Sequence, residues 1–165
     1  MKVKQWVLNA IIGSLYIVIT FAIAPLGFGA IQLRLSEMLN HLVVFNKKYA
    51  YGLGVGVILA NVLLSPFGII DWILGGGHTV VSLIVYMLLT RKMTSIKKKM
   101  IVNTVIFSVF SFIIAFLLII SGATEEAFWI TYLTLFISQF ITMAIGIPVM
   151  LFLNSKIDFN AQMEK

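Results

Sequence analysis

The sequence predicts an all-α integral membrane protein, a six-transmembrane-helix bundle with its N and C termini in the cytoplasm. The first observation is composition: of 165 residues, 61% are hydrophobic and 11% are charged, and a soluble domain of this size needs far more polar surface. The second is a series of apolar runs long enough, or nearly long enough, to cross a bilayer. The third is that Lys and Arg gather in alternate connections between those runs, as the positive-inside rule requires.

The composition also excludes several classes of protein. The chain has no cysteine, so disulfides and cysteine-ligated metals are excluded. In a membrane protein the net charge of +6 reflects the cytoplasmic ends of helices rather than nucleic-acid binding. Residues 1–165 are expected to form one domain, too short for a two-lobed carrier and without room for an ATPase. We therefore expect no cofactor, and transport would draw its energy from a gradient or from a partner.

The first half of the chain predicts three helices, which are Trp6–Leu26, Leu33–Phe45 and Tyr49–Leu64. The first has the length of a span, and no signal-peptide cleavage site accompanies it, so we expect it to be retained. A loop over Phe28–Ile31 leads to the second helix, which is short for a span and could be re-entrant. In the third helix, Gly52, Gly54 and Gly56 would let another backbone approach closely.

The second half predicts three more spans, which are Ile69–Thr90, Met100–Ile120 and Phe128–Leu153. A Ser-Pro-Phe-Gly turn precedes them. The glycines at 75, 76 and 77 are expected to break the first of these spans near its start, and Gly146 and Pro148 to kink the last. A basic loop, Arg91–Lys99, separates the first two spans, and an acidic loop, Gly122–Glu126, separates the last two.

Loop charge decides how the second helix is interpreted. If Leu33–Phe45 crosses the membrane, every Lys and Arg except Arg34 falls on the cytoplasmic side. If it does not cross, Lys47, Lys48 and the Arg91–Lys99 cluster move outside, against the positive-inside rule. Six spans are therefore expected, and most of the unusual polar residues then lie toward the outer end of the bundle.

The second helix carries the densest group of polar residues in the chain. Arg34, Glu37 and His41 share one face of a helix by their spacing, and Asn40 lies beside them. Polar groups at membrane depth face the protein interior or a water-filled cavity rather than lipid. The group is either an internal ion pair that fixes the helix, or a site where Glu37 or Asn40 binds a polar ligand that enters from outside.

Two further polar groups flank the turn before the fourth predicted helix. Asn61 ends the third helix, with structural and ligand-binding roles equally open, since Asn commonly bonds across helices in membranes. Asp71 and His78 share one face of the next helix, with Trp72 beside them. Asp71 follows the turn directly and could serve only as an N-cap.

An aromatic stripe in the last helix ends in an amide. Trp129, Tyr132 and Gln139 recur there at helical spacing. Such a stripe is usually core, and a Trp near the interface is usually an anchor. Flat aromatic walls with a few polar groups also suit a planar heterocycle. Both interpretations stay open on the residues alone.

Small residues mark one face of the first helix, at Ala10, Gly13 and Ser14. This spacing is typical of helix–helix contact in lipid, within the chain or with a partner. Enzyme classes find little support, because His41 and His78 are the only histidines and no metalloprotease, nucleophile-elbow or lipid-phosphotransferase motif is present.

Several segments, in their order and spacing, resemble the QueT family over nearly the whole chain. They are Ala24–Gly29, Ile31–Glu37, Leu59–Gly68 with Asp71 and Gly75, Leu135–Ile141 and Gly146–Pro148. QueT proteins are queuosine-precursor transporters, the substrate-binding S components of bacterial energy-coupling factor (ECF) transporters. The resemblance implies a six-helix subunit that captures a 7-deazaguanine (preQ1, preQ0 or queuine) from outside.

The resemblance also implies partners and residue roles. The chain would dock on a transmembrane T subunit with two cytoplasmic ATPases, would itself be no enzyme, and would be a multi-pass protein of the bacterial cell membrane. Glu37 or Asp71 would accept hydrogen bonds from the ligand. The other residues expected at the ligand are Arg34, Asn40, Asn61 and Gln139 for hydrogen bonds, His78, and Trp72, Trp129 and Tyr132 for stacking. Ala10, Gly13 and Ser14 would meet the T subunit. An S component for another vitamin, a membrane scaffold without transport and an independent ion-coupled carrier remain the alternatives.

Overall fold

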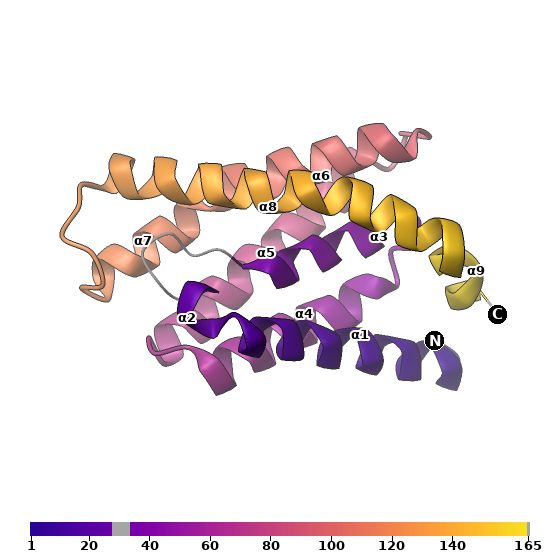
Figure 1. Ribbon diagram of the computed structural model, residues 1–165, viewed down its shortest axis with the longest axis horizontal. Coiled ribbons are helices and arrows are strands. Elements are labelled where there is room, and N and C mark those ends of the chain that lie inside the picture. The colour runs from indigo at the N-terminus through magenta and orange to yellow at the C-terminus, as the bar shows by residue number, and fades with distance from the viewer. Residues whose placement is uncertain (28–33, 165) are drawn as a thin grey trace.

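The computed structural model describes residues 1–27 and 34–164, and all regular structure within these ranges is helical (Figure 1). The expected loop Phe28–Ile31 and the expected helix start at Leu33 lie outside the described residues. In chain order the elements are α1 (Val3–Ala22), α2 (Ala24–Gly27), the 3₁₀ helix η1 (Leu35–His41), α3 (Leu42–Phe45), α4 (Tyr49–Leu64), α5 (Ile69–Leu89), α6 (Ile96–Phe110), α7 (Phe112–Ile120), α8 (Phe128–Ile157) and α9 (Phe159–Glu164).

Among the described residues, four helical stretches are long and apolar enough to cross a membrane. They are α1, α5, α6 with α7 as one stretch, and α8. Two shorter apolar stretches, Leu35–Phe45 and Tyr49–Leu64, complete the bundle. The chain is therefore a helical membrane protein, as predicted, while the count of six spans stays a prediction.

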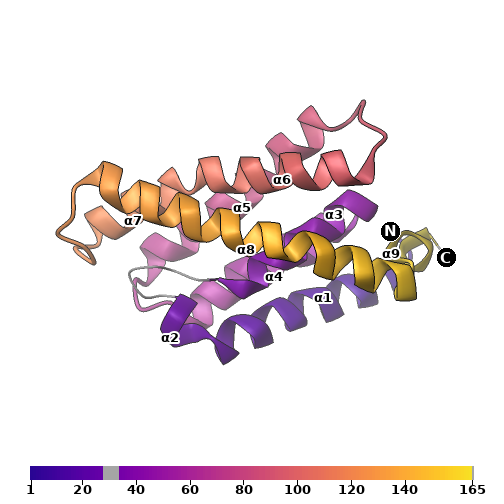
Figure 2. The ribbon, with the colours of Figure 1, turned by 45° about the horizontal axis from the view of Figure 1, so that its top comes forward.

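The helices run side by side along the longest axis of the molecule, and Figures 1 and 2 show its two ends. Both termini, the turn between α3 and α4 and the turn between α5 and α6 lie at one end, which we call the termini end. The α4–α5 turn and the α7–α8 loop lie at the opposite end. Ten of the twelve Lys and Arg residues belong to segments of the termini end: Lys2, Lys4, Lys47, Lys48, Arg91, Lys92, Lys97, Lys98, Lys99 and Lys156.

The second predicted helix has a different geometry from the one expected. Residues 35–41 form a 3₁₀ helix, and only Leu42–Phe45 is α-helical. In a 3₁₀ helix the side chains at i and i+3 eclipse each other. Asn40 therefore lies directly over Glu37, whereas an α-helix would have staggered them.

One expected interruption does not occur. The glycines at 75–77 do not break α5, which is continuous over Ile69–Leu89, because Gly75 and Gly76 leave room for neighbouring side chains within an intact helix. Pro148 lies inside α8, which continues over Phe128–Ile157, and the kink expected there stays a prediction. At Gly146 of that helix, an added Cβ would lie 3.0 Å from the Met38 side chain, so this glycine lets η1 cross α8 closely.

The fifth span and the basic loop also differ from expectation. The span is not uniform, since α6 ends at Phe110 and α7 starts at Phe112. The hydroxyl of Ser111 at the junction donates to the backbone oxygen of Ser108 (2.7 Å). The basic loop is shorter than predicted, because α6 begins at Ile96, with the Ser95 hydroxyl accepting a bond from the Lys98 amide.

A seam of glycines joins α1 to α4. A Cβ added to Gly56 would lie 2.8 Å from the Gly13 Cα, and one added to Gly52 would lie 2.4 Å from the Asn9 backbone oxygen. The Asn9 side-chain oxygen also accepts a hydrogen bond from the Gly52 amide (2.7 Å). No other residue type fits this approach, so the two backbones are in direct contact, as small residues allow in membranes.

Candidate functional site

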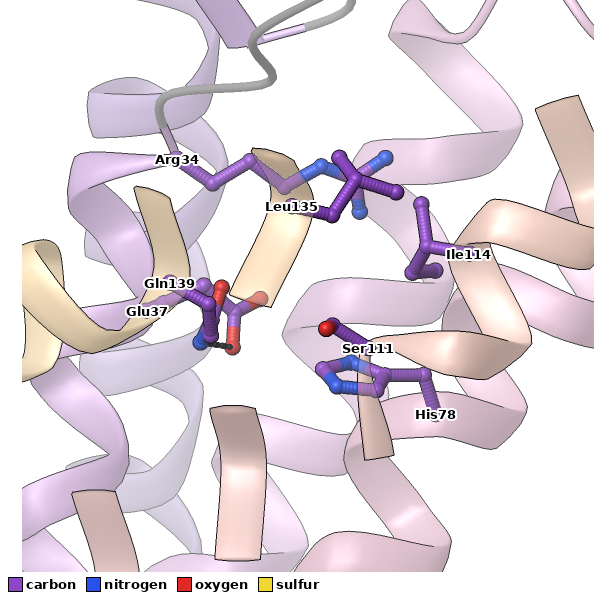
Figure 3. A pocket seen from close by; sticks show the side chains of 7 residues that line it. All are labelled: Arg34, Glu37, His78, Ser111, Ile114, Leu135 and Gln139. Atoms are coloured by element: carbon purple, nitrogen blue, oxygen red, sulfur yellow. Dashed lines mark hydrogen bonds between the residues drawn. The ribbon is translucent and has the colours of Figure 1, made fainter. Parts of the chain in front are cut away.

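A polar cavity lies among η1, α5, the α6–α7 junction and α8 (Figure 3). The cavity is nearly closed, with a free volume of about 10 Å³, which has room for about one water molecule, and its lining atoms come from Arg34, Glu37, His78, Ser111, Ile114, Leu135 and Gln139. Glu37 and Gln139 lie on one side, and His78 and Ser111 on the other. A ring of polar groups around enclosed space inside an apolar bundle is typical of a binding site for a small polar molecule.

Glu37 is the most enclosed of the charged residues in this ring, at 1% exposure. Its Oε1 accepts from the Tyr16 hydroxyl of α1 (2.5 Å). Its Oε2 accepts from Asn40 Nδ2 (2.8 Å), the residue that the 3₁₀ turn stacks on it, and lies 3.5 Å from Gln139 Nε2. Three elements therefore hold the carboxylate in one orientation, with Oε2 on the cavity side beside Gln139.

Arg34 connects the cavity to a second buried carboxylate. One guanidinium nitrogen lies 3.5 Å from Oδ2 of Asp71, and both side chains are buried. Among the described residues, no hydrogen-bond donor reaches the side-chain oxygens of Asp71, so the ion pair is the main compensation for burying this charge. Asn61 donates to the Asp71 backbone oxygen (3.2 Å). Gly75 leaves the space that the carboxylate fills, since an added Cβ would overlap Asp71 Oδ1.

The two histidines have tautomers fixed by backbone carbonyls. Nε2 of His78 lies 3.1 Å from the Phe107 oxygen, and Nε2 of His41 lies 2.9 Å from the Met143 oxygen. A carbonyl only accepts, so each Nε2 carries the proton. Nδ1 of His78 is then an acceptor on a ring that lines the cavity. Nδ1 of His41 lies 3.4 Å from the amide nitrogen of Asn103, away from the cavity lining.

The structure brings most of the polar candidates together. Four line the cavity: Arg34, Glu37, His78 and Gln139. Three others adjoin them, because Asn40 bonds Glu37, Asp71 pairs with Arg34, and Asn61 bonds Asp71.

The aromatic candidates lie elsewhere. Trp129 is 74% exposed and Trp72 is 38% exposed, and neither lines the cavity. Tyr132 donates its hydroxyl to the Val109 backbone oxygen (3.1 Å). Ile114 and Leu135 are the apolar residues of the cavity lining instead.

Besides the apolar lining residues Ile114 and Leu135, two polar residues of the site were not predicted from the sequence. Tyr16 is 1% exposed on α1 and donates to Glu37. A buried tyrosine hydroxyl needs a partner, and this requirement was the signal available in the first apolar run. Ser111 lines the cavity at the α6–α7 junction. Nothing in its sequence context distinguishes it from a serine that bonds only its own helix.

The small residues of α1 divide between two roles. Gly13 is buried in the seam against α4. Ala10 and Ser14 are exposed and line an open groove between α1 and α4, with a free volume of about 300 Å³. The same face therefore serves internal packing at Gly13 and offers a surface beside it.

Comparisons with known proteins show the family to which the chain belongs. The family model described as QueT transporter matches residues 6–155. The chain is 31% identical over 168 aligned residues to the protein named "Queuosine precursor transporter QueT" of Lactococcus lactis subsp. cremoris (strain MG1363), covering 96% of this chain and 97% of the relative. No solved structure matches the chain significantly. A family match over nearly the whole length of a helical membrane protein identifies a transporter rather than an enzyme: the chain belongs to the QueT transporter family.

Proposed function

We propose that the chain is the substrate-binding S component of an ECF-type importer and captures a queuosine precursor, one of preQ1, preQ0 or queuine. The observation that carries the proposal is Glu37, a buried carboxylate oriented by three elements at the edge of a polar cavity. A buried charge is costly unless it is paired or used. A ligand with several N–H donors would give it that use.

The chemistry of a 7-deazaguanine fits the lining residues. Its ring N–H and amino group are donors, for which Glu37 and Nδ1 of His78 are acceptors. Its carbonyl is an acceptor, for which the amide of Gln139 is a donor. Its flat apolar faces suit Ile114 and Leu135. The elements that line the cavity lie close together, so we expect η1 and α8 to move away from α5 and the α6–α7 junction when the ligand enters.

The orientation in the membrane follows from charge. The termini end carries ten of the twelve basic residues, which favours a cytoplasmic position in the bacterial cell membrane. The short Leu35–Phe45 stretch then completes one of six crossings. Arg34, the remaining described cation, belongs to the cavity on the other side of that crossing, so the ligand would enter from outside.

The partners would be a transmembrane T subunit and two cytoplasmic ATPases, which supply the energy. The groove beside Ala10 and Ser14 is the surface that we assign to the T subunit. Small residues there would let a partner helix approach α1 closely.

Ligand binding to the purified protein is the direct test. Thermal unfolding would be followed with queuine, preQ1, preQ0, guanine and a panel of B vitamins, because a ligand that binds only the native state raises the apparent stability with its concentration. Stabilisation by deazaguanines alone, lost in Glu37→Gln, would support the proposal. Glu126→Gln, the same change on an exposed loop residue, is the matched control.

Other results would redirect the assignment. Stabilisation by a vitamin alone would keep the architecture and replace the ligand. No stabilisation, together with no co-purification of ATPases, would favour a membrane scaffold. Uptake into vesicles that lack any ATPase would indicate an independent carrier.

A further inference from the structure

Two open apolar grooves of similar size run along the outside of α5. One lies against α4, with a free volume of about 380 Å³, and the other against α7, with a free volume of about 400 Å³. We call them the α4–α5 groove and the α5–α7 groove. Both lie against α5, which is long and apolar enough to cross a membrane, so lipid chains are their natural surroundings. They differ in charge, because only the α4–α5 groove has basic residues at one end.

The α4–α5 groove ends at basic residues. Lys47 and Lys48, which precede α4, belong to its lining. Arg91 and Lys92 follow α5 at the same end of the bundle, one turn beyond the lining residue Met87, and are exposed. Lys48 lies 3.4 Å from a carboxylate oxygen of Glu164, which offsets its charge. Lys47, Arg91 and Lys92 therefore contribute most of the net positive charge at this end of the groove. The lining of the α5–α7 groove contains no charged residue.

The floor of the α4–α5 groove is open because of a glycine. Gly54 lies seven residues beyond Lys47, about 10 Å along a helix, and belongs to the lining with Val80 and Leu83. A Cβ added to Gly54 would meet the Val80 side chain at 3.9 Å, an ordinary contact. Unlike Gly52 and Gly56, this glycine therefore touches no backbone and leaves a channel on the surface. Half of a bilayer's hydrocarbon core is about 15 Å thick. A lipid whose headgroup lies at Lys47 would therefore place the upper part of an acyl chain over Gly54.

Aromatic residues place the basic end at the membrane surface. Tyr51 lines the groove one turn into α4, is 58% exposed, and its ring centroid lies 6.2 Å from that of Trp6. Exposed Tyr and Trp on a membrane protein mark the headgroup level. The lysines are thus at the depth of phosphate groups, with an apolar channel leading away from them.

We propose that the α4–α5 groove is a binding site for an acidic phospholipid. The phosphate-bearing headgroup lies between Lys47 and the Arg91–Lys92 pair, and one acyl chain lies over Gly54. An amphiphile with an anionic head and an apolar tail matches a groove that is charged at one end only, because basic pockets between membrane helices attract anionic headgroups. The site is independent of the cavity around Glu37 and of the transported substrate.

The test is lipid retention by the purified, delipidated protein, measured by native mass spectrometry after exchange against phosphatidylglycerol or phosphatidylcholine. The wild-type chain is expected to retain phosphatidylglycerol preferentially. Lys47→Gln with Lys48→Gln is expected to lower that retention about fivefold for each lysine that faces the headgroup. Gly54→Leu fills the channel and is expected to lower retention with all charges in place.

Matched controls separate the groove from general charge and bulk. Lys97→Gln with Lys98→Gln removes two exposed lysines at the same end, and Gly77→Leu adds the same side chain to the α5–α7 groove; both are expected to retain phosphatidylglycerol as the wild type does. Equal retention of the two lipids, or equal losses in the Lys47/Lys48 and Lys97/Lys98 variants, would overturn the proposal. So would groove variants that lose a co-purifying protein but keep the lipid. If Gly54→Leu does not fold, the lysine pair and its control decide alone.

Discussion

The α1–α4 seam and the polar cavity are two ways of holding the same bundle together. In the seam, Gly13 and Gly56 bring two backbones into contact, and no room is left between them for a Cβ atom. Around the cavity, side chains such as Glu37 and Asn40 hold the elements by hydrogen bonds and leave enclosed space. A seam of backbone contacts has one arrangement, whereas a hydrogen-bonded ring can exchange a protein partner for a ligand. The binding chemistry is therefore expected in the second region, with the first as its rigid support.

The largest expected effect is steric disruption of the seam by Gly56→Leu. The new Cβ alone would lie 2.8 Å from the Gly13 Cα, and a backbone cannot move aside as a flexible side chain can. We expect a loss of more than about 4 kcal/mol, in the range that unfolds marginal proteins, seen as aggregated or absent protein in size-exclusion chromatography.

Gly54→Leu, two residues away on the same helix, is the control for Gly56→Leu. It makes the same change where the nearest neighbour is a side-chain atom at 3.9 Å, and it is expected to give folded protein. Equal damage from both substitutions would mean that α4 tolerates no bulk at all, and the distinction between the seam and the outer surface would fail.

The next effect is the loss of ligand affinity in Glu37→Gln. The substitution keeps the shape and removes the charge, so the charge-assisted bonds to a ligand donor are lost. These contribute about 1.5–3 kcal/mol, which corresponds to roughly a 10- to 150-fold rise in Kd, measured by titration of the purified protein with the deazaguanine that stabilises it. The fold is expected to persist. Unchanged affinity in a folded variant would remove Glu37 from the site.

A smaller effect is expected for Tyr16→Phe. Tyr16 lies on α1, which forms the seam, but its hydroxyl donates to Glu37 of the cavity. The substitution leaves Oε1 of Glu37 without its donor, at a cost of about 1–2 kcal/mol in stability. Because the carboxylate remains, the ligand-induced rise in melting temperature is expected to remain as well. Thermal unfolding with and without ligand measures both. A lost ligand response with unchanged stability would show that Tyr16 belongs to the site and not to its support.

Much of the fold could be predicted because it depends on local properties. Apolar length predicted the spanning stretches, and helical spacing marked Arg34 and Glu37 in one segment and Gln139 in another, all three of which line the cavity. Each such signal lies within one segment of the chain. The membrane makes the signals strong, because polar groups within it must find internal partners.

What could not be predicted depends on contacts between distant segments. The 3₁₀ geometry of η1 accompanies a close crossing at Gly146 of α8. The glycines at 75–77 suggested a break, but Gly75 instead makes room for Asp71. The aromatic stripe around Trp129 has the same spacing whether it faces a pocket or the outside, so periodicity alone could not orient it.

The smallest expected effect concerns pH at the termini end, where α9 closes the bundle. Hydrogen bonds from Asn46 and Lys48, together with the charge of Lys48, lower the pKa of Glu164 below its usual value of 4.5. A lowered folded-state pKa adds stability that is complete above the unfolded-state pKa and is lost as the pH falls through the folded-state value. Glu164→Gln is therefore expected to melt slightly below the wild type at pH 7, and the difference should disappear as the pH falls below the folded-state pKa of Glu164.

The control for Glu164→Gln is Glu126→Gln, which removes an exposed carboxylate at the opposite end. Lys48 and Glu164 are themselves largely exposed, so solvent and salt screen the pair, and the difference at pH 7 should shrink further in high salt. Neither change touches the seam or the cavity, so ligand affinity is expected to stay constant in both variants. A changed ligand affinity in Glu164→Gln would mean that the contact of α9 with Asn46 and Lys48 affects the cavity through α3 and η1. The termini end and the cavity could then no longer be treated as independent.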